Sequence, residues 1–385
     1  MRGCGPDGLP VLEDLTGGSD LGGLRALVRV DMNVPLAKDD SGNQRVADDF
    51  RIRAAVPTLE WLTARGVHVV ACTHLGRPGG TRDPRFELAP VRERLGQVLP
   101  GIELMENLRF YPGEAADDEA FVLDLVAGKD LYVNDAFGSC HRNHASIVGP
   151  PRYLPSAAGR LVEREVRELS GLLDSPAWPF VVVLGGAKVA DKLGLVASLS
   201  ERADRVLVGG GMAFTFTESL GFPAGGSIVD RERLAECRTL LARRANITLP
   251  VDFVTAGGPG GDEVGVSGLT ISDGRRGLDI GPATTEEFCE AIKGAGTVLW
   301  NGPMGVFEDP RFAAGTRAIA GAVASCPGHS VIGGGDSAAA VHELGMGGQV
   351  DYISTGGGAA LELLEHGDLP GLRALRENSR VLSTR

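Results

Sequence analysis

The stretch Phe180-Val-Val-Val-Leu-Gly-Gly-Ala-Lys188 decides the fold of this chain. An apolar run that ends at two glycines is typical of a strand buried on both faces and followed by a tight turn. The pattern returns at Arg205-Val-Leu-Val-Gly-Gly-Gly-Met212, Thr297-Val-Leu-Trp-Asn-Gly-Pro303, Ser330-Val-Ile-Gly-Gly-Gly-Asp-Ser337 and Tyr352-Ile-Ser-Thr-Gly-Gly-Gly-Ala359. Because helical stretches separate these runs, the pattern predicts an α/β fold with a parallel sheet.

The first half repeats the scheme with polar strand ends in place of glycines. The strands are predicted at Arg25-Ala-Leu-Val-Arg-Val30, at Val67-His-Val-Val-Ala-Cys72 and at Lys129-Asp-Leu-Tyr-Val133. Asp, Asn, His and Arg residues follow them, which predicts a second sheet with its own ligand. We therefore expect two α/β domains, 1–172 and 173–371. A helix over 157–173, ended by prolines, lies at the boundary, and a short polar tail, 372–385, follows.

Composition narrows the class of protein. A chain of 385 residues with 43% hydrophobic and 23% charged residues fits a soluble protein of two domains. Its net charge of −12 is spread along the chain and argues against nucleic acid as a partner. No apolar run is long enough for a membrane span, and the first residues do not resemble a secretory signal. The six scattered cysteines contain no C-x-x-C pair and are predicted to be free thiols, as in the cytoplasm.

Five glycine turns at successive strand ends favour a phosphate or nucleotide site. The P-loop pattern does not occur, and none of the glycine turns that follow the predicted strands matches the dinucleotide fingerprint G-x-G-x-x-G. Only five lysines are present, and Lys188 and Lys192 lie four apart after the first glycine turn, a spacing that would put both on one helix face. Asp336 opens another predicted helix, where Mg²⁺ could bridge its carboxylate to phosphate oxygens.

Arginines gather at the strand ends of the first half. Arginine forks bind phosphate and carboxylate oxygens in a bidentate manner. The candidates are Arg51, Arg77, Arg109 and Arg142, together with His74 and His141.

The chain resembles the phosphoglycerate kinase family from about Leu24 to its end. The matching motifs are Arg29-Val-Asp-Met-Asn-Val-Pro35, His74-Leu-Gly-Arg-Pro78, Glu106-Asn-Leu-Arg-Phe110, Asp135-Ala-Phe-Gly-Ser-Cys-His-Arg142, Gly185-Gly-Ala-Lys-Val-Ala-Asp-Lys192, Gly209-Gly-Gly-Met-Ala-Phe-Thr-Phe216, Leu278-Asp-Ile-Gly-Pro282, Trp300-Asn-Gly-Pro303, Gly334-Gly-Asp-Ser337 and Ser354-Thr-Gly-Gly-Gly-Ala359. Small departures, such as Met32 where Phe is commoner, keep the size of the side chain.

The resemblance implies two doubly wound, Rossmann-like domains that face each other across a cleft. It implies 3-phosphoglycerate or 1,3-bisphosphoglycerate on the N-terminal domain, and ADP or ATP with Mg²⁺ on the C-terminal domain. The chain's end would return to the N-terminal domain, and the protein would be a cytoplasmic monomer of glycolysis.

The resemblance also assigns roles to residues of this sequence. Arg51 and Lys188 would act in catalysis. The substrate would be bound by Asp31, Met32, Asn33, Arg51, His74, Leu75, Gly76, Arg77, Arg109 and Arg142. The nucleotide would be bound by Lys192, Gly277, Glu308, Gly334, Gly335, Asp336 and Ser337, with Asp336 as the metal ligand.

Two alternatives stay open on the sequence alone. One is an NAD-dependent dehydrogenase on a doubly wound sheet, although the fingerprint is missing after the predicted strands. The other is a non-catalytic relative that binds a nucleotide or a partner, since a fold does not prove a function.

Overall fold

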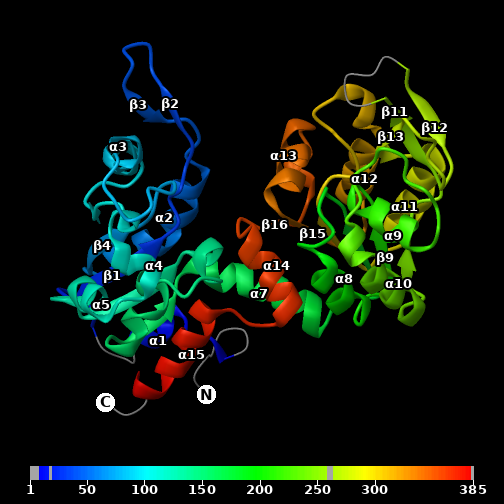
Figure 1. Ribbon diagram of the computed structural model, residues 1–385. Coiled ribbons are helices and arrows are strands. Elements are labelled where there is room, and N and C mark those ends of the chain that lie inside the picture. Colours follow the sequence, from blue (N-terminus) through cyan, green and yellow to red (C-terminus); the bar gives the residue numbers. More distant parts are fainter. Residues whose placement is uncertain (1–7, 17–19, 258–262, 383–385) are drawn as a thin grey trace. The chain divides into compact units, whose positions relative to one another are not determined.

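The computed structural model describes residues 8–16, 20–257 and 263–382, which form two compact units (Figure 1). The first unit contains the described residues up to Arg167 and from Asp368 onward, and the second contains Glu168–Gly367. The long helix α7, Arg160–Asp174, includes the point of division.

A five-stranded parallel sheet forms the centre of the first unit, in the order β5-β4-β1-β6-β7. The strands are β1 Arg25–Val30, β4 His68–Cys72, β5 Glu103–Leu104, β6 Leu131–Asp135 and β7 Ser156–Ala158. The chain passes from β1 through β4 to β5 and then returns to the other side of β1 with β6 and β7. The order therefore reverses beside β1, which is where open α/β sheets bind ligands.

Helices and one hairpin complete the first unit. The helices are α1 Leu12–Thr16, α2 Phe50–Thr63, α3 Ala89–Val98, α4 Pro112–Ala116, α5 Glu119–Val126, α6 Ala145–Val148 and α15 Pro370–Leu382, and the hairpin is β2 Leu36–Lys38 with β3 Gln44–Val46. Short 3₁₀ turns lie at η2 Pro84–Phe86, η3 Leu108–Phe110, η4 Phe137–Ser139 and η5 Pro150–Arg152.

The second unit has a six-stranded parallel sheet in the order β10-β9-β8-β14-β15-β16. Its strands are β8 Phe180–Leu184, β9 Arg205–Val208, β10 Ile247–Thr248, β14 Thr297–Asn301, β15 His329–Gly333 and β16 Tyr352–Ile353. Every residue of β8 and of β14 is buried, as the continuous apolar runs predict. The order reverses between β8 and β14, which gives the second unit its own switch point.

In the described part of this unit, an antiparallel sheet and a set of helices complete the core. The sheet consists of β11 Phe253–Ala256, β12 Gly265–Ser267 and β13 Arg276–Ile280. The helices are α8 Leu193–Ser200, α9 Met212–Ser219, α10 Leu234–Arg243, α11 Pro282–Lys293, α12 Ala314–Ala324, α13 Gly335–Glu343 and α14 Gly358–His366, with 3₁₀ turns η6 Arg231–Arg233, η7 Pro310–Phe312 and η8 Gly347–Gln349. Both units thus have the doubly wound α/β architecture that the sequence predicts.

The helix predicted over 157–173 begins later than expected. Ser156–Ala158 form the strand β7 beside β6, and the helix α7 starts only at Arg160. Gly159 separates the two, because its N–H still bonds the Asn134 carbonyl oxygen and a Cβ there would lie 2.3 Å from an Asp135 carboxylate oxygen. The helical spacing of the apolar residues therefore led to a predicted start at residue 157, three residues before the helix begins at Arg160.

The described part of the predicted polar tail, up to Leu382, belongs to the helix α15 (Figure 1). Leu372 and Leu375 are fully buried in the first unit. Asn378 donates its amide to the Leu154 carbonyl oxygen at 2.5 Å and to Ser156 Oγ at 3.1 Å. A helix was not predicted here, because charged residues flank an apolar stripe that has a spacing of three.

None of the described helices combines the length and apolar character that crossing a membrane requires. Within the described residues, Cys72, Cys140, Cys237, Cys289 and Cys326 are free thiols, and Cys4 lies outside them.

Candidate functional sites in the two units

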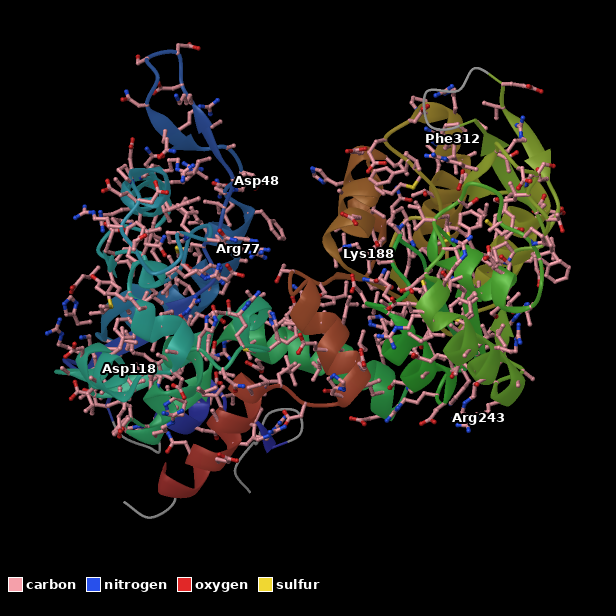
Figure 2. The ribbon with its side chains drawn as sticks, in the orientation of Figure 1. Asp48, Arg77, Asp118, Lys188, Arg243 and Phe312 are labelled. Carbon is pink, nitrogen blue, oxygen red and sulfur yellow. The ribbon has the colours of Figure 1, made fainter. Side chains whose placement is uncertain are left out.

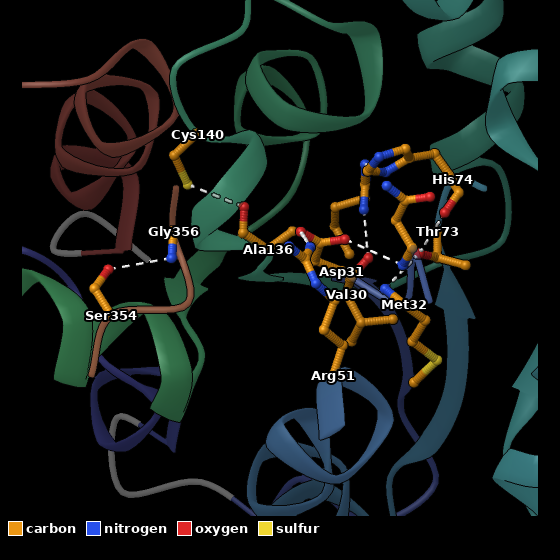
Figure 3. A network of polar contacts seen from close by, with 12 residues as sticks. Val30, Asp31, Met32, Arg51, Thr73, His74, Ala136, Cys140, Ser354 and Gly356 are labelled. Atoms are coloured by element: carbon orange, nitrogen blue, oxygen red, sulfur yellow. Dashed lines mark hydrogen bonds and ion pairs between the residues drawn. The ribbon is translucent and has the colours of Figure 1, made fainter. Parts of the chain in front are cut away.

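Asp31 and Arg51 meet at the carboxyl end of β1 in the first unit (Figure 3). Arg51 Nη1 donates to Asp31 Oδ2 at 2.5 Å, and the backbone N–H of Asn33 donates to Asp31 Oδ1 at 3.2 Å. The Asp31 side chain is 8% exposed, whereas that of Arg51 is 37% exposed. The arginine is therefore oriented by the acid and still open to a ligand.

The turn after β4 is tied to the turn after β1. The backbone N–H of Met32 donates to Thr73 Oγ1, and that of Gly76 donates to Asn33 Oδ1, each at 2.9 Å. Met32 and Leu75 point their side chains into the core, so only their backbone could face a ligand. Gly76 has φ +62°, and a Cβ there would lie 2.2 Å from the Phe86 ring, which requires glycine.

Asn107 links this turn to η3, a role that the sequence analysis did not assign. It is fully buried and accepts the backbone N–H of Leu75 at 3.2 Å and that of Arg109 at 3.1 Å. Its amide donates to the carbonyl oxygens of Leu75 and Phe86. The residue lies in a quoted motif, but its burial could not be read from the sequence.

Three of the predicted arginines line one open pocket of about 600 Å³. Arg77, labelled in Figure 2, Arg109 and Arg142 share it with Gly79, Gly80, Tyr111, Pro112, Glu114, Ala115 and His144. Burial, followed by the repulsion of Arg142 and Arg29, lowers the pKa of Arg109 to about 10. Positive charges held this close favour an anionic ligand.

His74 is separate from the residues that line this pocket and is only 5% exposed. Burial, together with the charges of Arg29, Arg109 and Arg51, holds its pKa well below the usual value of 6.5. His74 is therefore a neutral imidazole at neutral pH. Arg29, which the sequence analysis quoted only as part of a motif, lies 3.1 Å from its ring.

In the second unit the predicted helix face of Lys188 and Lys192 does not form. The helix α8 begins at Leu193, and the preceding residues 186–192 are not helical. Lys192 folds back so that its Nζ donates to the Gly185 carbonyl oxygen at 2.6 Å. Lys188 is exposed after β8 (Figure 2), and no hydrogen bond or ion pair joins it to the described residues. The spacing rule failed because the turn at Gly186, with φ +99°, delays the helix.

Glycines with positive φ form the turns at the carboxyl ends of β14 and β15. Gly302 follows β14 with φ +91°, and a Cβ there would lie 2.6 Å from Lys192 Nζ. Gly334 follows β15 with φ +88°, and a Cβ there would lie 2.5 Å from Asn301 Nδ2. Asn301, which the sequence analysis gave no role, is buried, and its Oδ1 has no hydrogen-bond donor among the described residues.

The N-terminus of α13 completes this group. Gly334 caps the helix, and Gly335, Asp336 and Ser337 form its first turn. Ser337 is buried, and its hydroxyl accepts the Gly302 N–H at 2.5 Å. The first-turn N–H groups of a helix have no intrahelical acceptor and bind anions readily.

Asp336 fits a magnesium ion that is shared with a ligand. Its carboxylate is exposed in the first turn of α13. Among the described residues no group of three His, Cys, Asp or Glu could hold a metal ion by itself. Mg²⁺ commonly takes one carboxylate, phosphate oxygens and waters, so this donor set suits a phosphate-bound ion.

Gly277 and Glu308 lie apart from these turns. Gly277, in β13, donates its N–H to Ser227 Oγ at 2.9 Å, and a Cβ there would lie 2.2 Å from the Phe214 ring. Glu308 is exposed in the loop between β14 and η7. Beneath that loop is Asp279, another unpredicted residue, whose pKa burial raises to about 7.

Comparison with known proteins matches both units. The family model "Phosphoglycerate kinase" matches residues 16–103 and 100–367. The chain is 47% identical to the phosphoglycerate kinases of Salinispora tropica and Rubrobacter xylanophilus, over 94% of this chain and 98% of each relative. The solved phosphoglycerate kinase of Coxiella burnetii matches with a TM-score of 0.86 at 34% identity, over 94% of this chain and 98% of that one. That of Pyrococcus horikoshii matches with a TM-score of 0.81 at 31% identity, over 97% and 100%.

Proposed function

The chain belongs to the phosphoglycerate kinase family, and from that premise we propose that it transfers a phosphoryl group reversibly, with Mg²⁺, from 1,3-bisphosphoglycerate to ADP. The products are 3-phosphoglycerate and ATP, and the reaction serves glycolysis. The enzyme is a cytoplasmic monomer. Its membership of an enzyme family of this name supports the activity.

The proposal is supported by one group of residues suited to an anion near the switch point of each sheet. The first unit offers the pocket of Arg77, Arg109 and Arg142, which suits the phosphate of the glycerate substrate. The second offers Lys192 and the N-terminus of α13, which suit the phosphates of a nucleotide. We assign the N-terminal domain, 1–172 with 372–385, to 3-phosphoglycerate and the C-terminal domain, 173–371, to ADP or ATP.

The first unit holds the glycerate substrate through charge and backbone groups. Asp31 and Asn33 contact the glycerate body, while the three pocket arginines hold the phosphate that is not transferred. His74, which is outside the lining of that pocket, assists them through its exposed edge. Met32, Leu75 and Gly76 contribute only backbone, because the two side chains are in the core. Arg51 points at the reacting carboxyl phosphate.

The second unit holds the nucleotide. Gly277 lies at the adenine and Glu308 at the ribose. Lys192, Gly334, Gly335 and Ser337 bind the phosphates, and Asp336 holds Mg²⁺, which when bound neutralises phosphate charge. Lys188 neutralises the phosphoryl group during transfer.

This reaction needs no general acid or base. The attacking ADP oxygen is already ionised at neutral pH, and the leaving carboxylate is stable without a proton. Repulsion between two polyanions is the obstacle, so alignment and fixed positive charge provide the catalysis. The neutral state of His74 agrees with this absence of proton transfer.

Because the two substrates bind to different domains, hinge closure accompanies turnover. Closure brings the reacting groups in line and keeps water from the acyl phosphate.

A coupled assay tests the proposal. The protein is given 3-phosphoglycerate, ATP and Mg²⁺, and an NADH-consuming dehydrogenase traps the 1,3-bisphosphoglycerate. We expect Mg²⁺-dependent turnover, and a KM for 3-phosphoglycerate that rises about 10-fold or more in Arg77→Gln. The matched control is Arg82→Gln, since Arg82 is exposed and paired with Glu87 at 3.0 Å.

Each rival function makes a different prediction in the same experiment. A folded protein that binds ATP without turnover would favour the non-catalytic relative. Nicotinamide binding without phosphoryl transfer would favour the dehydrogenase.

A further inference from the structure

Arg29, in β1, is a fully charged side chain that is only 1% exposed. Its Nη2 lies 3.1 Å from His74 Nδ1, its Nε donates to Ser146 Oγ at 2.9 Å, and its Nη1 donates to the Val30 carbonyl oxygen. The guanidinium thus makes its hydrogen bonds inside the protein. The proposed function gives it no role.

A buried acid balances this charge through Ser146. The Ser146 hydroxyl donates to Glu114 Oε1 at 2.7 Å, and its backbone N–H donates to Oε2 at 3.0 Å. Glu114 is 1% exposed, and burial alone would raise its pKa. Hydrogen bonds from His144 and Ser146 and the charge of Arg29 lower that pKa overall. Glu114, Ser146, Arg29 and His74 therefore form one buried chain of polar contacts.

The donor in the contact between Arg29 and His74 determines which ring nitrogen of His74 carries the proton. A guanidinium has N–H donors and no acceptor, so the Nδ1 atom opposite it must be an acceptor. A neutral imidazole with an unprotonated Nδ1 carries its proton on Nε2. If both ring nitrogens of His74 carried protons, the Nδ1–H would face an N–H of the Arg29 guanidinium, and two buried cations would lie side by side. The other titratable groups that act on His74 are Arg109, Arg51 and His144.

We propose that Arg29 is a positioning residue that fixes His74 as the neutral tautomer protonated on Nε2. His74 then recognises an anionic substrate as a hydrogen-bond donor and not as a cation. The substrate named here rests on the proposed function, whereas the tautomer does not.

The tautomer can be measured on the whole wild-type protein by long-range ¹H–¹⁵N NMR of its histidine rings. The chain has seven histidines, and a His74→Gln spectrum identifies the signals of His74. We expect a proton on Nε2, none on Nδ1, and no titration between about pH 5.5 and 8. A proton on Nδ1, or titration near the ordinary pKa, would overturn the proposal.

Variants test the role of Arg29. In Arg29→Met we expect His74 to populate both neutral tautomers, because Nδ1 loses its fixed donor. The KM for 3-phosphoglycerate should rise about 10-fold, while the KM for ATP serves as the internal reference. If Arg29→Met does not fold, Ser146→Ala removes the hydroxyl that holds Nε and should shift the His74 signals in the same direction. Unchanged His74 signals in a folded Arg29→Met would refute the positioning role.

Replacing His74 itself shows whether the substrate needs a hydrogen-bond donor or a positive charge at this position. Glutamine offers a neutral acceptor and donor, whereas leucine offers neither. We expect His74→Leu to bind 3-phosphoglycerate about 10-fold or more weakly than His74→Gln, the scale of one hydrogen bond to a charged group. Equal losses would mean that charge is what the site requires. If wild-type protein neither binds nor phosphorylates 3-phosphoglycerate, the proposed function fails, and the NMR result still decides the tautomer.

Discussion

Lys192 Nζ donates a 2.6 Å hydrogen bond to the carbonyl oxygen of Gly185, seven residues earlier, and so holds its charge against the turn that follows β8. Burial lowers the pKa of Lys192 to about 8, although Asp336 and Asp191 oppose the shift. The carbonyl oxygen orients the ammonium without neutralising it. A bound phosphate would supply the missing negative charge.

Nucleotide affinity should therefore depend on pH. Above about pH 8 the amine loses its proton, and a neutral amine attracts phosphate weakly, so we expect the affinity for MgADP to fall several-fold per pH unit. Calorimetric titration between about pH 7 and 9.5 measures it. Lys192→Met should bind weakly with a much flatter pH profile. A wild-type affinity that stays constant over this range would contradict the role of Lys192.

Lys188→Ala should lower kcat about 100-fold, the scale of one preorganised charge contact. Lys188 is exposed and has no ion pair with the described residues, so its loss should leave the fold and substrate binding nearly intact. Coupled steady-state kinetics measures the change, and Lys38→Ala, at the exposed end of the hairpin strand β2, is the control. Near-normal turnover in Lys188→Ala would remove this residue from the mechanism.

Gly277→Ala should disturb the proposed adenine site and the stability of the second unit. The new methyl group would lie 2.2 Å from the Phe214 ring, which itself packs on Phe253 with ring centroids 4.8 Å apart. Overpacking of this kind costs about 1–3 kcal/mol. Denaturant unfolding and ATP affinity report both effects. Gly268→Ala, where a Cβ meets nothing within 4 Å, should behave as wild type, and equal behaviour of the two variants would refute the clash.

Asp279 should make stability fall as pH rises. Its oxygens accept the Gly315 N–H at 2.8 Å and the Ile280 N–H at 2.9 Å, yet burial raises its pKa from 3.8 to about 7. The folded state therefore binds a proton that the unfolded state has released, and this contribution is full below about pH 4 and lost as pH rises through about 7.

The comparison with Asp279→Asn isolates that contribution. We expect the free energy of unfolding of wild type minus that of Asp279→Asn to decrease between about pH 5 and 8, measured by urea unfolding. A difference that is constant over this range would show that Asp279 has an ordinary pKa.

The sheets could be predicted from sequence because burial on both faces leaves a local signature. Phe180–Leu184 and Thr297–Asn301 are buried at every position, and runs of apolar residues at their centres mark both strands. The start of α7 and the helix α15 could not be placed so well. In both, the deciding contacts come from distant residues, such as Asn378 with Leu154.

In the candidate sites, too, residues with a local sequence pattern were predicted, and residues that depend on distant contacts were not. Arg77, Arg109 and Arg142 were found by type and by position at strand ends, and they line one pocket. Arg29 and Asn107 were given no role because their importance depends on burial and on partners that no local pattern reveals. The arrangement of Lys188 and Lys192 was wrong because a glycine turn replaced the expected helix.

The return of α15 to the first unit has a consequence for synthesis on the ribosome. The unit that begins the chain is completed by residues from Asp368 onward, after the whole of Glu168–Gly367. At about 5–20 residues per second, translation of the intervening segment takes about 10–40 s. During that time β7 and η5 lack their helical cover. The first unit therefore stays incomplete, with part of its core exposed, until the last residues of the chain have been translated.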